Sequence, residues 1–329
     1  MRTIISRREI CGGAAAAAIG IPLGASAASA SPVHIRLGYS QAAEEQLWLL
    51  MAKPDLGKNY GKIYTFDATR FPSSSNRAQA FAAGAIDIAS GAASGLLFAA
   101  AEGIPMKIIA SLCRESRRGD FSTSFLSLAS SKINSIKDLK GKTVAVNGFS
   151  TAGELWVRAA LQENGLTEKD ITIVPIRFPA MADSLRSGRI DAGEFPQPFA
   201  AMAEKEMKVK TIFRAADVVP FDEELVVLIS TEPYLQKNAV AVRAFLADLQ
   251  ATTRFYLKHT KAARQILIDK KFVRAPADIY LTMKDYYRDP ALRVSVSDLK
   301  KMQDLQISAG FQKKRADIDS LVDMSYLPK

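Results

Sequence analysis

Two stretches of the chain share one pattern: Phe81–Asp87 reads FAAGAID and Leu185–Asp191 reads LRSGRID. Their glycines, Gly84 and Gly188, are 104 residues apart, and an alanine-rich segment and an apolar segment follow each of them. Glycine in this position is typical of the end of a helix, because it adopts the left-handed conformation that closes one. The repeat therefore favours two related α/β lobes over a chance similarity between two βα units of like composition. We expect the aspartate of each copy to do structural work at the strand that follows.

Strands and helices alternate through residues 33–230, which predicts βαβ units and a largely parallel sheet. The expected strands are Val33–Tyr39, Lys62–Asp67, Ile86–Ala89, Met106–Leu112, Phe121–Ala129, Lys142–Asn147, Ile171–Ile176, Ile190–Ala192, Val209–Phe213 and Leu225–Ser230. The expected helices between them are Ala42–Met51, Asn76–Ala83, Ala92–Ala101, Thr151–Asn164, Ala180–Ser187 and Pro198–Glu206. Helices then dominate, and we expect this tail to pack on the first lobe: Ala239–Lys258, Thr260–Lys270, Pro276–Asp285 and Ser297–Ala309.

Residues 1–30 have the composition of a cleaved export signal. Three arginines in the first eight residues precede an uncharged run, Ile10–Val33, and small residues before Ala30 suit a signal peptidase. Ser6–Ile10 resembles the twin-arginine export motif, although adjacent arginines also occur in ordinary signals. A membrane anchor is the alternative interpretation, but the run is mostly alanine and glycine and contains Pro22, so it is poorly apolar. We therefore expect a periplasmic protein.

The composition is that of an ordinary globular protein and excludes several classes. The chain has 329 residues, 48% of them hydrophobic and 24% charged, which suggests about two domains. The formal net charge is +10, but the basic residues are scattered without interleaved aromatic residues, so we expect no nucleic-acid partner. Two cysteines and two histidines are too few for a Cys/His metal site, and we expect neither a metal nor a cofactor. Cys113 is expected to be a buried thiol.

Residues 33–329 resemble the periplasmic solute-binding proteins of ABC importers, of the nitrate/sulfonate/taurine and thiamine-precursor type. The stretches that carry the resemblance are Arg77–Ile88, Asp138–Val146, Ala182–Ala192 and Val226–Leu235. The resemblance implies the two-lobed type II fold, in which each lobe is a mostly parallel sheet flanked by helices and the ligand lies between the lobes. It implies lobe 1 at residues 31–120 and 222–329, lobe 2 at residues 121–221, and permease and ATPase subunits as partners. We expect a monomer.

The candidate binding residues follow the strand ends, because ligands of open α/β sheets bind beyond the carboxyl ends of the strands. They are Ser40, Gln41, Arg70, Phe71, Ser90, Gly91, Ala92, Ser150, Thr151, Phe178 and Glu194. Ser150 and Thr151 precede a helix whose free N–H groups favour an anion, although plain helix capping needs the same residues. The resemblance also places the loops at Ser90–Ala92 and after Val144–Asn147 at the cleft.

Charged residues at the strand ends indicate the ligand chemistry. Arg70, Arg114 and Arg177 each offer a bidentate partner to a carboxylate or sulfonate, and for each the alternative is a solvated surface arginine. Glu194 departs from a site built only for anions, because a carboxylate accepts from an amine or hydroxyl of the ligand, or pairs with an arginine. The aromatic residues near these ends suit a small-molecule pocket.

We expect a binding protein rather than an enzyme. No GxSxG, HExxH or P-loop motif is present, and a single mature cysteine excludes the cysteine cluster of the pyrimidine-forming branch of the resembling family. The expected function is delivery of a small organic solute, a sulfonate, carboxylate or similar anion, to an ABC importer. The alternatives are a protein that presents its ligand to a sensor, a binder of heterocycles like the thiamine precursors, and an enzyme on the same scaffold.

Overall fold

Ten strands form two five-stranded sheets in the part of the chain that the computed structural model describes, residues 31–116 and 118–329. The first sheet has the order β2-β1-β3-β10-β4: β2 (Tyr64–Arg70), β1 (Val33–Tyr39), β3 (Ile88–Ala92), β10 (Glu223–Ser230) and β4 (Lys107–Glu115). The second sheet has the order β7-β6-β8-β5-β9: β7 (Thr172–Pro175), β6 (Thr143–Val146), β8 (Ala192–Phe195), β5 (Ser124–Leu128) and β9 (Val209–Arg214).

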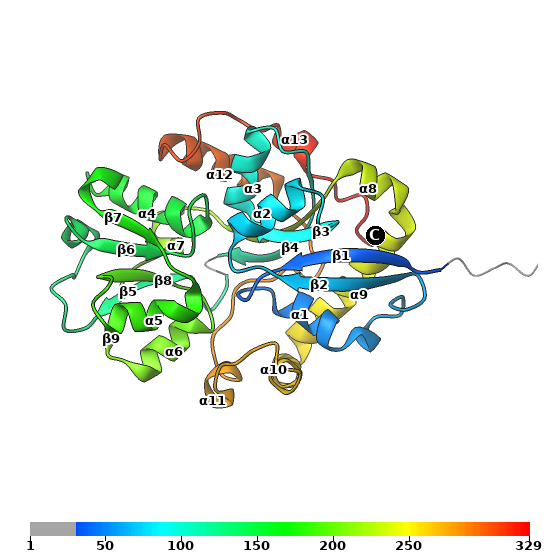
Figure 1. Ribbon diagram of the computed structural model, residues 1–329, viewed down its shortest axis with the longest axis horizontal. Helices are drawn as coiled ribbons and strands as arrows, with labels where there is room; N and C mark the ends of the chain where they lie inside the picture. Colours follow the sequence, from blue (N-terminus) through cyan, green and yellow to red (C-terminus); the bar gives the residue numbers. More distant parts are fainter. Residues whose placement is uncertain (1–30, 117) are drawn as a thin grey trace, which may run out of the picture. The chain divides into compact units, whose positions relative to one another are not determined.

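Helices flank both sheets, and Figure 1 shows each sheet with its own set. Four of them accompany the second sheet: α4 (Ala152–Glu163), α5 (Phe178–Arg186), α6 (Phe199–Glu206) and α7 (Ala215–Val218). The helices that precede them in the chain are α1 (Glu45–Ala52), α2 (Ser74–Ala82) and α3 (Ala93–Ala101). Those that follow are α8 (Glu232–Lys237), α9 (Ala239–Lys258), α10 (Thr260–Asp269), α11 (Ala277–Tyr280), α12 (Val296–Ser308) and α13 (Ile318–Leu321).

The predicted α/β class with mostly parallel sheets is confirmed, and each sheet is mixed because one of its five strands runs against the other four. In the first sheet β1 runs parallel to β2 and β3, whereas β10 runs antiparallel to β3 and β4. In the second sheet β6 runs parallel to β7 and β8, whereas β5 runs antiparallel to β8 and β9. Both antiparallel strands are the first strands after the chain crosses from one sheet to the other. No βαβ connection fixes their direction.

The repeated motif builds the same joint in both sheets. Gly84 and Gly188 have φ values of +69° and +70°, the left-handed conformation expected after a helix. Oδ2 of Asp87 accepts a hydrogen bond from the backbone N–H of Arg36 at 2.8 Å, and Oδ2 of Asp191 accepts one from Thr143 at 2.9 Å. Each aspartate thus fastens the loop before β3 or β8 to the neighbouring parallel strand.

Several predicted boundaries shift, and two shifts affect the site. The strand predicted at Ile190–Ala192 is β8 at Ala192–Phe195, because the N–H of Ile190 still bonds the carbonyl of Ser184 in the turn that ends α5. Glu194 is therefore inside a strand instead of beyond its end. The prediction of a helix at Pro276–Asp285 is wrong except for one turn, α11. Beyond this turn the chain forms backbone hydrogen bonds with other segments instead.

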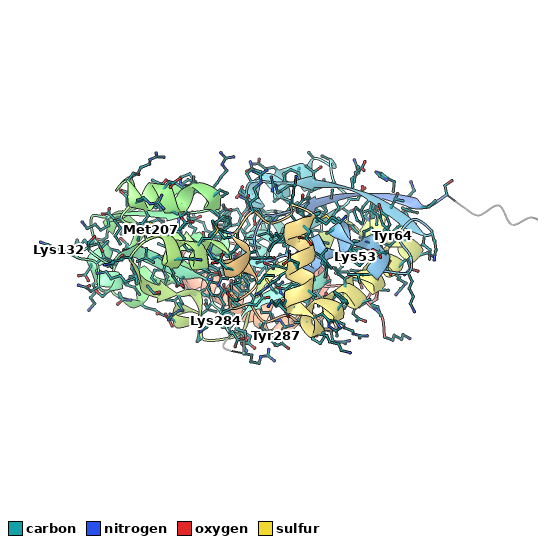
Figure 2. All side chains as sticks on the ribbon, turned by 90° about the horizontal axis from the view of Figure 1, so that it is seen from below. Lys53, Tyr64, Lys132, Met207, Lys284 and Tyr287 are labelled. Atoms are coloured by element: carbon teal, nitrogen blue, oxygen red, sulfur yellow. The ribbon has the colours of Figure 1, made fainter. Side chains whose placement is uncertain are left out.

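The C-terminal helices lie mainly against the first sheet and its helices. Helix α9 packs on α1 and β2, α12 packs on α3 and β10, and α13 packs on β4. The segment after α11 instead runs between the two sheets, where Phe121 donates its N–H to the carbonyl of Asp285. Figure 2 shows Lys284 and Tyr287 of this segment near the middle of the long axis, between Lys132 and Met207 at one end and Lys53 and Tyr64 at the other.

The predicted export signal, its twin-arginine motif and its cleavage after Ala30 lie outside the described residues. None of the described helices combines the length and hydrophobicity that crossing a bilayer requires. Cys113 is fully buried in β4, and burial raises the pKa of its thiol well above the usual value.

Candidate functional site

A cavity of about 60 Å³ lies between the two sheets. This is several times the ~15 Å³ that one water molecule needs, so the space fits a small solute. Its lining combines apolar, aromatic and charged side chains from both sheets: Ser40, Ala42, Ala43, Glu44, Ser74, Arg77, Ala92, Thr123, Asn147, Thr151, Ala152, Trp156, Phe178, Glu194, Pro196, Leu225, Val226 and Tyr286.

Five helices begin at this cavity. The lining includes Glu44 at the start of α1, Ser74 of α2, Ala92 before α3, Thr151 before α4, and Phe178 of α5. A helix N-terminus presents unpaired N–H groups and the positive end of the helix dipole. Convergence of such ends on one space favours a ligand that carries negative charge or hydrogen-bond acceptors.

Glu44 and Arg77 form a buried charge pair on the first-sheet side. Oε2 of Glu44 accepts from the N–H of Ser40 at 2.8 Å and Oε1 accepts from Oγ of Ser90 at 2.6 Å. Nη2 of Arg77 lies 3.8 Å from Oε1 of Glu44, and its Nε donates to the carbonyl of Ser90. Both side chains are almost fully buried, and burial raises the pKa of Glu44 while lowering that of Arg77.

Two donors of the lining are left unpaired. Nη1 of Arg77 and Nδ2 of Asn147 are buried and have no hydrogen-bond partner in the described structure. A buried donor without a partner costs about 1–3 kcal/mol, which a ligand acceptor would recover. Both groups belong to residues that line the cavity, so a ligand acceptor that reaches them would be favoured there.

Glu194 brings a carboxyl group to the opposite, second-sheet side. Its Oε2 accepts from the backbone N–H of Asn147 at 2.9 Å. Burial raises the pKa of Glu194 to about 7, while the Asn147 bond opposes this and the nearby charge of Glu115 adds to it. Gly153 provides the room for this carboxyl, since a Cβ at residue 153 would overlap Oε2 of Glu194.

Two further buried glutamates lie outside the cavity lining, one where the chain leaves the first sheet and one where it returns to it. Glu115, the last residue of β4, is the cross-strand partner of Glu223, the first residue of β10. Nε1 of Trp156 donates to Oε2 of Glu223 at 2.7 Å, and Thr123 donates to Glu115. Burial raises the pKa of Glu115 to about 7 and that of Glu223 to about 8. These carboxyls hold the cavity walls at Trp156 and Thr123.

Five of the predicted binding residues line this cavity: Ser40, Ala92, Thr151, Phe178 and Glu194. Ser90 acts behind it, by donating to Glu44. The hydroxyl of Thr151 is committed to the carbonyl of Gly148 at 2.6 Å, and its side chain makes no capping bond. The Thr151 hydroxyl can therefore only accept from a ligand, and a ligand acceptor at this helix end would have to meet backbone N–H groups.

The structure places the remaining predicted residues elsewhere. Gln41, Arg70 and Phe71 line a separate cavity of about 500 Å³ together with Arg177. Ser150 lines another of about 340 Å³, and Gly91 packs against Leu96. The prediction that Arg114 ends a strand at the cleft is wrong. It is inside β4, buried, and bonded to Glu224 at 2.8 Å, because β4 continues three residues past the predicted end.

Sequence reasoning missed the groups that give the cavity its polarity. Glu44, Arg77, Asn147, Trp156 and Tyr286 line it but were not selected. Asn147 is the last residue of a predicted strand. The strand-end rule selected Ser150 and Thr151 in the loop that follows it, but not Asn147 itself. Arg77 is within a predicted helix, and Tyr286 directly follows the helix predicted at Pro276–Asp285, so neither is at the end of a predicted strand. Among the described residues, no three side chains of His, Cys, Asp or Glu come together as metal ligands.

The profile of the NMT1/THI5-like family matches residues 69–263, more than half of the chain. The chain belongs to the NMT1/THI5-like family. The matched range includes Arg77, Asn147 and Glu194 of the cavity. It leaves out the lining at Ser40–Glu44 and Tyr286. No curated protein matches the chain.

Solved structures confirm the fold of this NMT1/THI5-like protein. The alkanesulfonate-binding protein SsuA from Xanthomonas axonopodis pv. citri, bound to MOPS, superposes with a TM-score of 0.74 at 19% identity, covering 89% of this chain and 99% of that one. The aliphatic sulphonate-binding protein SsuA from Escherichia coli gives 0.70 at 20% identity, with 89% and 92% covered. The nitrate-binding protein NrtA from Synechocystis PCC 6803 gives 0.73 at 13% identity, with 90% and 87% covered. The chain has the type II periplasmic binding protein fold.

Proposed function

We propose that this protein is the solute-binding subunit of an ABC importer and that it holds a small organic anion in the cavity between the sheets. The observation that carries the proposal is the pair of unpaired buried donors, Nη1 of Arg77 and Nδ2 of Asn147, in a cavity where five helices begin. The structural relatives named for binding sulfonates and nitrate are consistent with an oxyanion.

The proposed lobes follow the two sheets. Lobe 1 is residues 31–120 and 222–329, and lobe 2 is residues 121–221. The lining of the cavity comes from both, so parting of the lobes would open it and their approach would enclose a solute. The protein acts in the periplasm as a monomer and delivers its solute to permease and ATPase subunits.

The proposed activity is binding without chemical change. Glu194 is the one carboxyl of the lining without a basic partner, and the described cavity offers it no histidine, cysteine or lysine as a second catalytic group. Mass spectrometry of a solute recovered after prolonged incubation should therefore return it unaltered.

The test is a thermal shift screen of the purified protein against small carboxylates, sulfonates and nitrate. A solute at about 100 times its Kd should stabilise the protein by about 3 kcal/mol. Asn147→Ala removes one unpaired donor and should weaken the best solute about fivefold to tenfold, while the control Asn164→Ala, at the end of α4, should not. Absence of any shift, or equal binding by both variants, would contradict the proposal.

A further inference from the structure

Two buried carboxyl groups lie side by side where the chain crosses between the sheets. Glu115 ends β4 just before the first crossing, Glu223 begins β10 just after the return, and the two are directly opposite each other in the ladder. Both are almost fully buried, and no basic side chain of the described chain forms a salt bridge with either. Buried carboxylates are normally paired with a cation, because an unpaired buried charge is costly. This pair therefore needs protons to be stable in its present surroundings.

Each of the two carboxyl groups also joins the proposed lobes. Oε1 of Glu115 accepts from Oγ1 of Thr123 at 2.5 Å, and Oε2 of Glu223 accepts from Nε1 of Trp156 at 2.7 Å. Both glutamates belong to lobe 1 of the proposed division, whereas Thr123 and Trp156 belong to lobe 2. Trp156 also lines the solute cavity. The pair thus connects the two crossings to a wall of the cavity.

The surrounding groups do not neutralise this pair. Glu194 of β8 brings a third carboxyl, whose pKa the charge of Glu115 raises further. Burial raises the pKa of the Tyr286 hydroxyl and of the Cys113 thiol well above their usual values, so both stay uncharged. The arginines of the neighbouring segments are committed to other carboxylates: Arg114 to Glu224, Arg118 to Asp222, Arg158 to Glu154, and Arg288 to Glu45 and Asp285. Oε1 of Glu223 has no hydrogen-bond partner in the described structure.

We propose that Glu115 and Glu223 couple protonation to lobe closure: protons held by the pair keep the lobes together as in this structure, and their loss to solvent at higher pH favours separation of the lobes. Closing then takes up protons and opening releases them. This inference goes beyond the proposed function and takes from it only the movement of the lobes.

The direction of the effect follows from burial. Burial raises the pKa of Glu115 to about 7 and that of Glu223 to about 8. Separation of the lobes would break the bonds from Thr123 and Trp156 and admit water, which returns both carboxyls toward their usual pKa. The open form therefore ionises more readily than the closed form. For each carboxyl, the ratio of closed to open protein should fall up to about tenfold per pH unit below its closed-form pKa, and no further above it.

The experiment measures the size of the full chain by small-angle X-ray scattering at several pH values between 6 and 8.5, after dialysis and without added solute. The radius of gyration of the wild type should increase with pH. Glu223→Gln keeps an uncharged acceptor for Trp156, so this variant should stay compact throughout. The control Glu232→Gln changes an exposed carboxyl and should open as the wild type does.

The fluorescence of Trp156 supplies a second readout. Trp48→Phe leaves Trp156 as the one tryptophan of the chain. Its emission should change over the same pH range as the radius of gyration, because its indole bonds Glu223 across the crossing. Glu223→Gln in this background should remove the change. Should Glu223→Gln not fold, the two curves of the Trp48→Phe protein decide: a common midpoint supports the coupling, and an emission change at constant size contradicts it.

A wild-type size that is independent of pH would overturn the proposal, as would a pH-dependent size that Glu223→Gln retains. Circular dichroism at each pH distinguishes opening, which preserves the helix content, from unfolding. An expansion that is accompanied by loss of helix would also overturn the proposal. Because no solute is added, none of these results bears on the proposed function, which the thermal shift screen tests separately.

Discussion

At the scale of single residues, small side chains decide which polar groups reach the cavity. Gly153 in the first turn of α4 leaves the space that the Glu194 carboxyl occupies. Gly148, five residues earlier, has no such neighbour: the nearest atom to a Cβ there would be 3.5 Å away. Although both glycines flank the same loop, only at residue 153 would a side chain overlap a neighbouring group.

Gly153→Ala should displace the Glu194 carboxyl and weaken solute binding about tenfold or more. Overpacking of a buried position costs about 1–3 kcal/mol, which exceeds the gain of about 1 kcal/mol in helix propensity. Thermal unfolding and calorimetric titration check both effects. Gly148→Ala serves as the control and should leave both quantities nearly unchanged, and an equal effect of the two substitutions would contradict the assigned role of Gly153.

Thr151→Trp should fill the cavity and abolish solute binding while the protein still folds. Thr151 is 4% exposed and lines the cavity, whereas Phe149 of the same loop is 52% exposed and does not. Phe149→Trp is therefore the matched control, and it should bind normally. Circular dichroism confirms folding of each variant. Normal binding by Thr151→Trp would place the solute elsewhere, with the cavity at Arg70 and Arg177 as the next candidate.

At the scale of elements, the ladder between β4 and β10 places two carboxyls opposite each other where the chain crosses between the sheets. Glu115 faces Glu223, both are buried, and neither forms a salt bridge in the described chain. Like charges directly opposite in a ladder destabilise it. The next pair along, Arg114 and Glu224, is an ion pair at 2.8 Å. The protonated form of the first pair is therefore the stable one.

The free energy of unfolding should fall as the pH rises from 5 to 8. Burial raises the pKa of Glu223 to about 8 and that of Glu115 to about 7, so the folded protein keeps protons that the unfolded chain has lost. Each such group lowers the free energy of unfolding by about 1.4 kcal/mol for each pH unit between its unfolded and folded pKa values. Above its folded pKa it causes no further decrease. Urea unfolding at several pH values measures this slope.

Glu223→Gln should flatten that slope and make the protein more stable than the wild type at pH 8. The control Glu232→Gln concerns a carboxyl whose side chain is 57% exposed, and it should leave the slope as it is. A wild-type stability that is constant or rises between pH 5 and 8 would show that these carboxyls are ionised in the folded protein.

The elements themselves could largely be predicted from the sequence, and the site only in part. Helix α9 occurs at the predicted Ala239–Lys258, because a single long apolar face determines it. The repeat identified two similar joints at Gly84 and Gly188. Strand direction in β5 and β10 depends on which sheet the chain re-enters, and local patterns carry no such information. The role of Arg77 could not be predicted for the same reason. It depends on Glu44, which lies 33 positions away in the sequence and contacts Arg77 only in the folded chain.

At the scale of the whole molecule, helices α2 and α3, which belong with the first sheet, contact the loop before α4 of the second through small residues. Oγ of Ser75 donates to the carbonyl of Phe149 at 2.6 Å. A Cβ at Gly95 of α3 would lie 2.5 Å from the carbonyl oxygen of Ser150. Helix α3 can therefore approach the loop before α4 this closely only because residue 95 is glycine.

The series Gly95→Ala and Gly95→Val should weaken solute binding progressively by holding the proposed lobes apart. The free energy of unfolding should not decrease along with the affinity. Alanine in a helix is favoured over glycine by about 1 kcal/mol, and the new side chain would have no close neighbour once the lobes are apart. Small-angle X-ray scattering with and without solute checks the closure, and calorimetry checks the affinity. Closure and affinity equal to the wild type in both variants would show that this contact does not limit the approach of the lobes.

The proposed function places a small solute in the cavity lined by Arg77, Asn147 and Glu194. The most direct test is a crystal structure of the protein with the solute that gives the largest thermal shift. We expect an acceptor of the solute within 3.2 Å of Nη1 of Arg77 or Nδ2 of Asn147, a normal hydrogen-bond distance. A solute bound instead in the cavity at Gln41, Arg70 and Arg177, with the inner cavity holding only water, would contradict it.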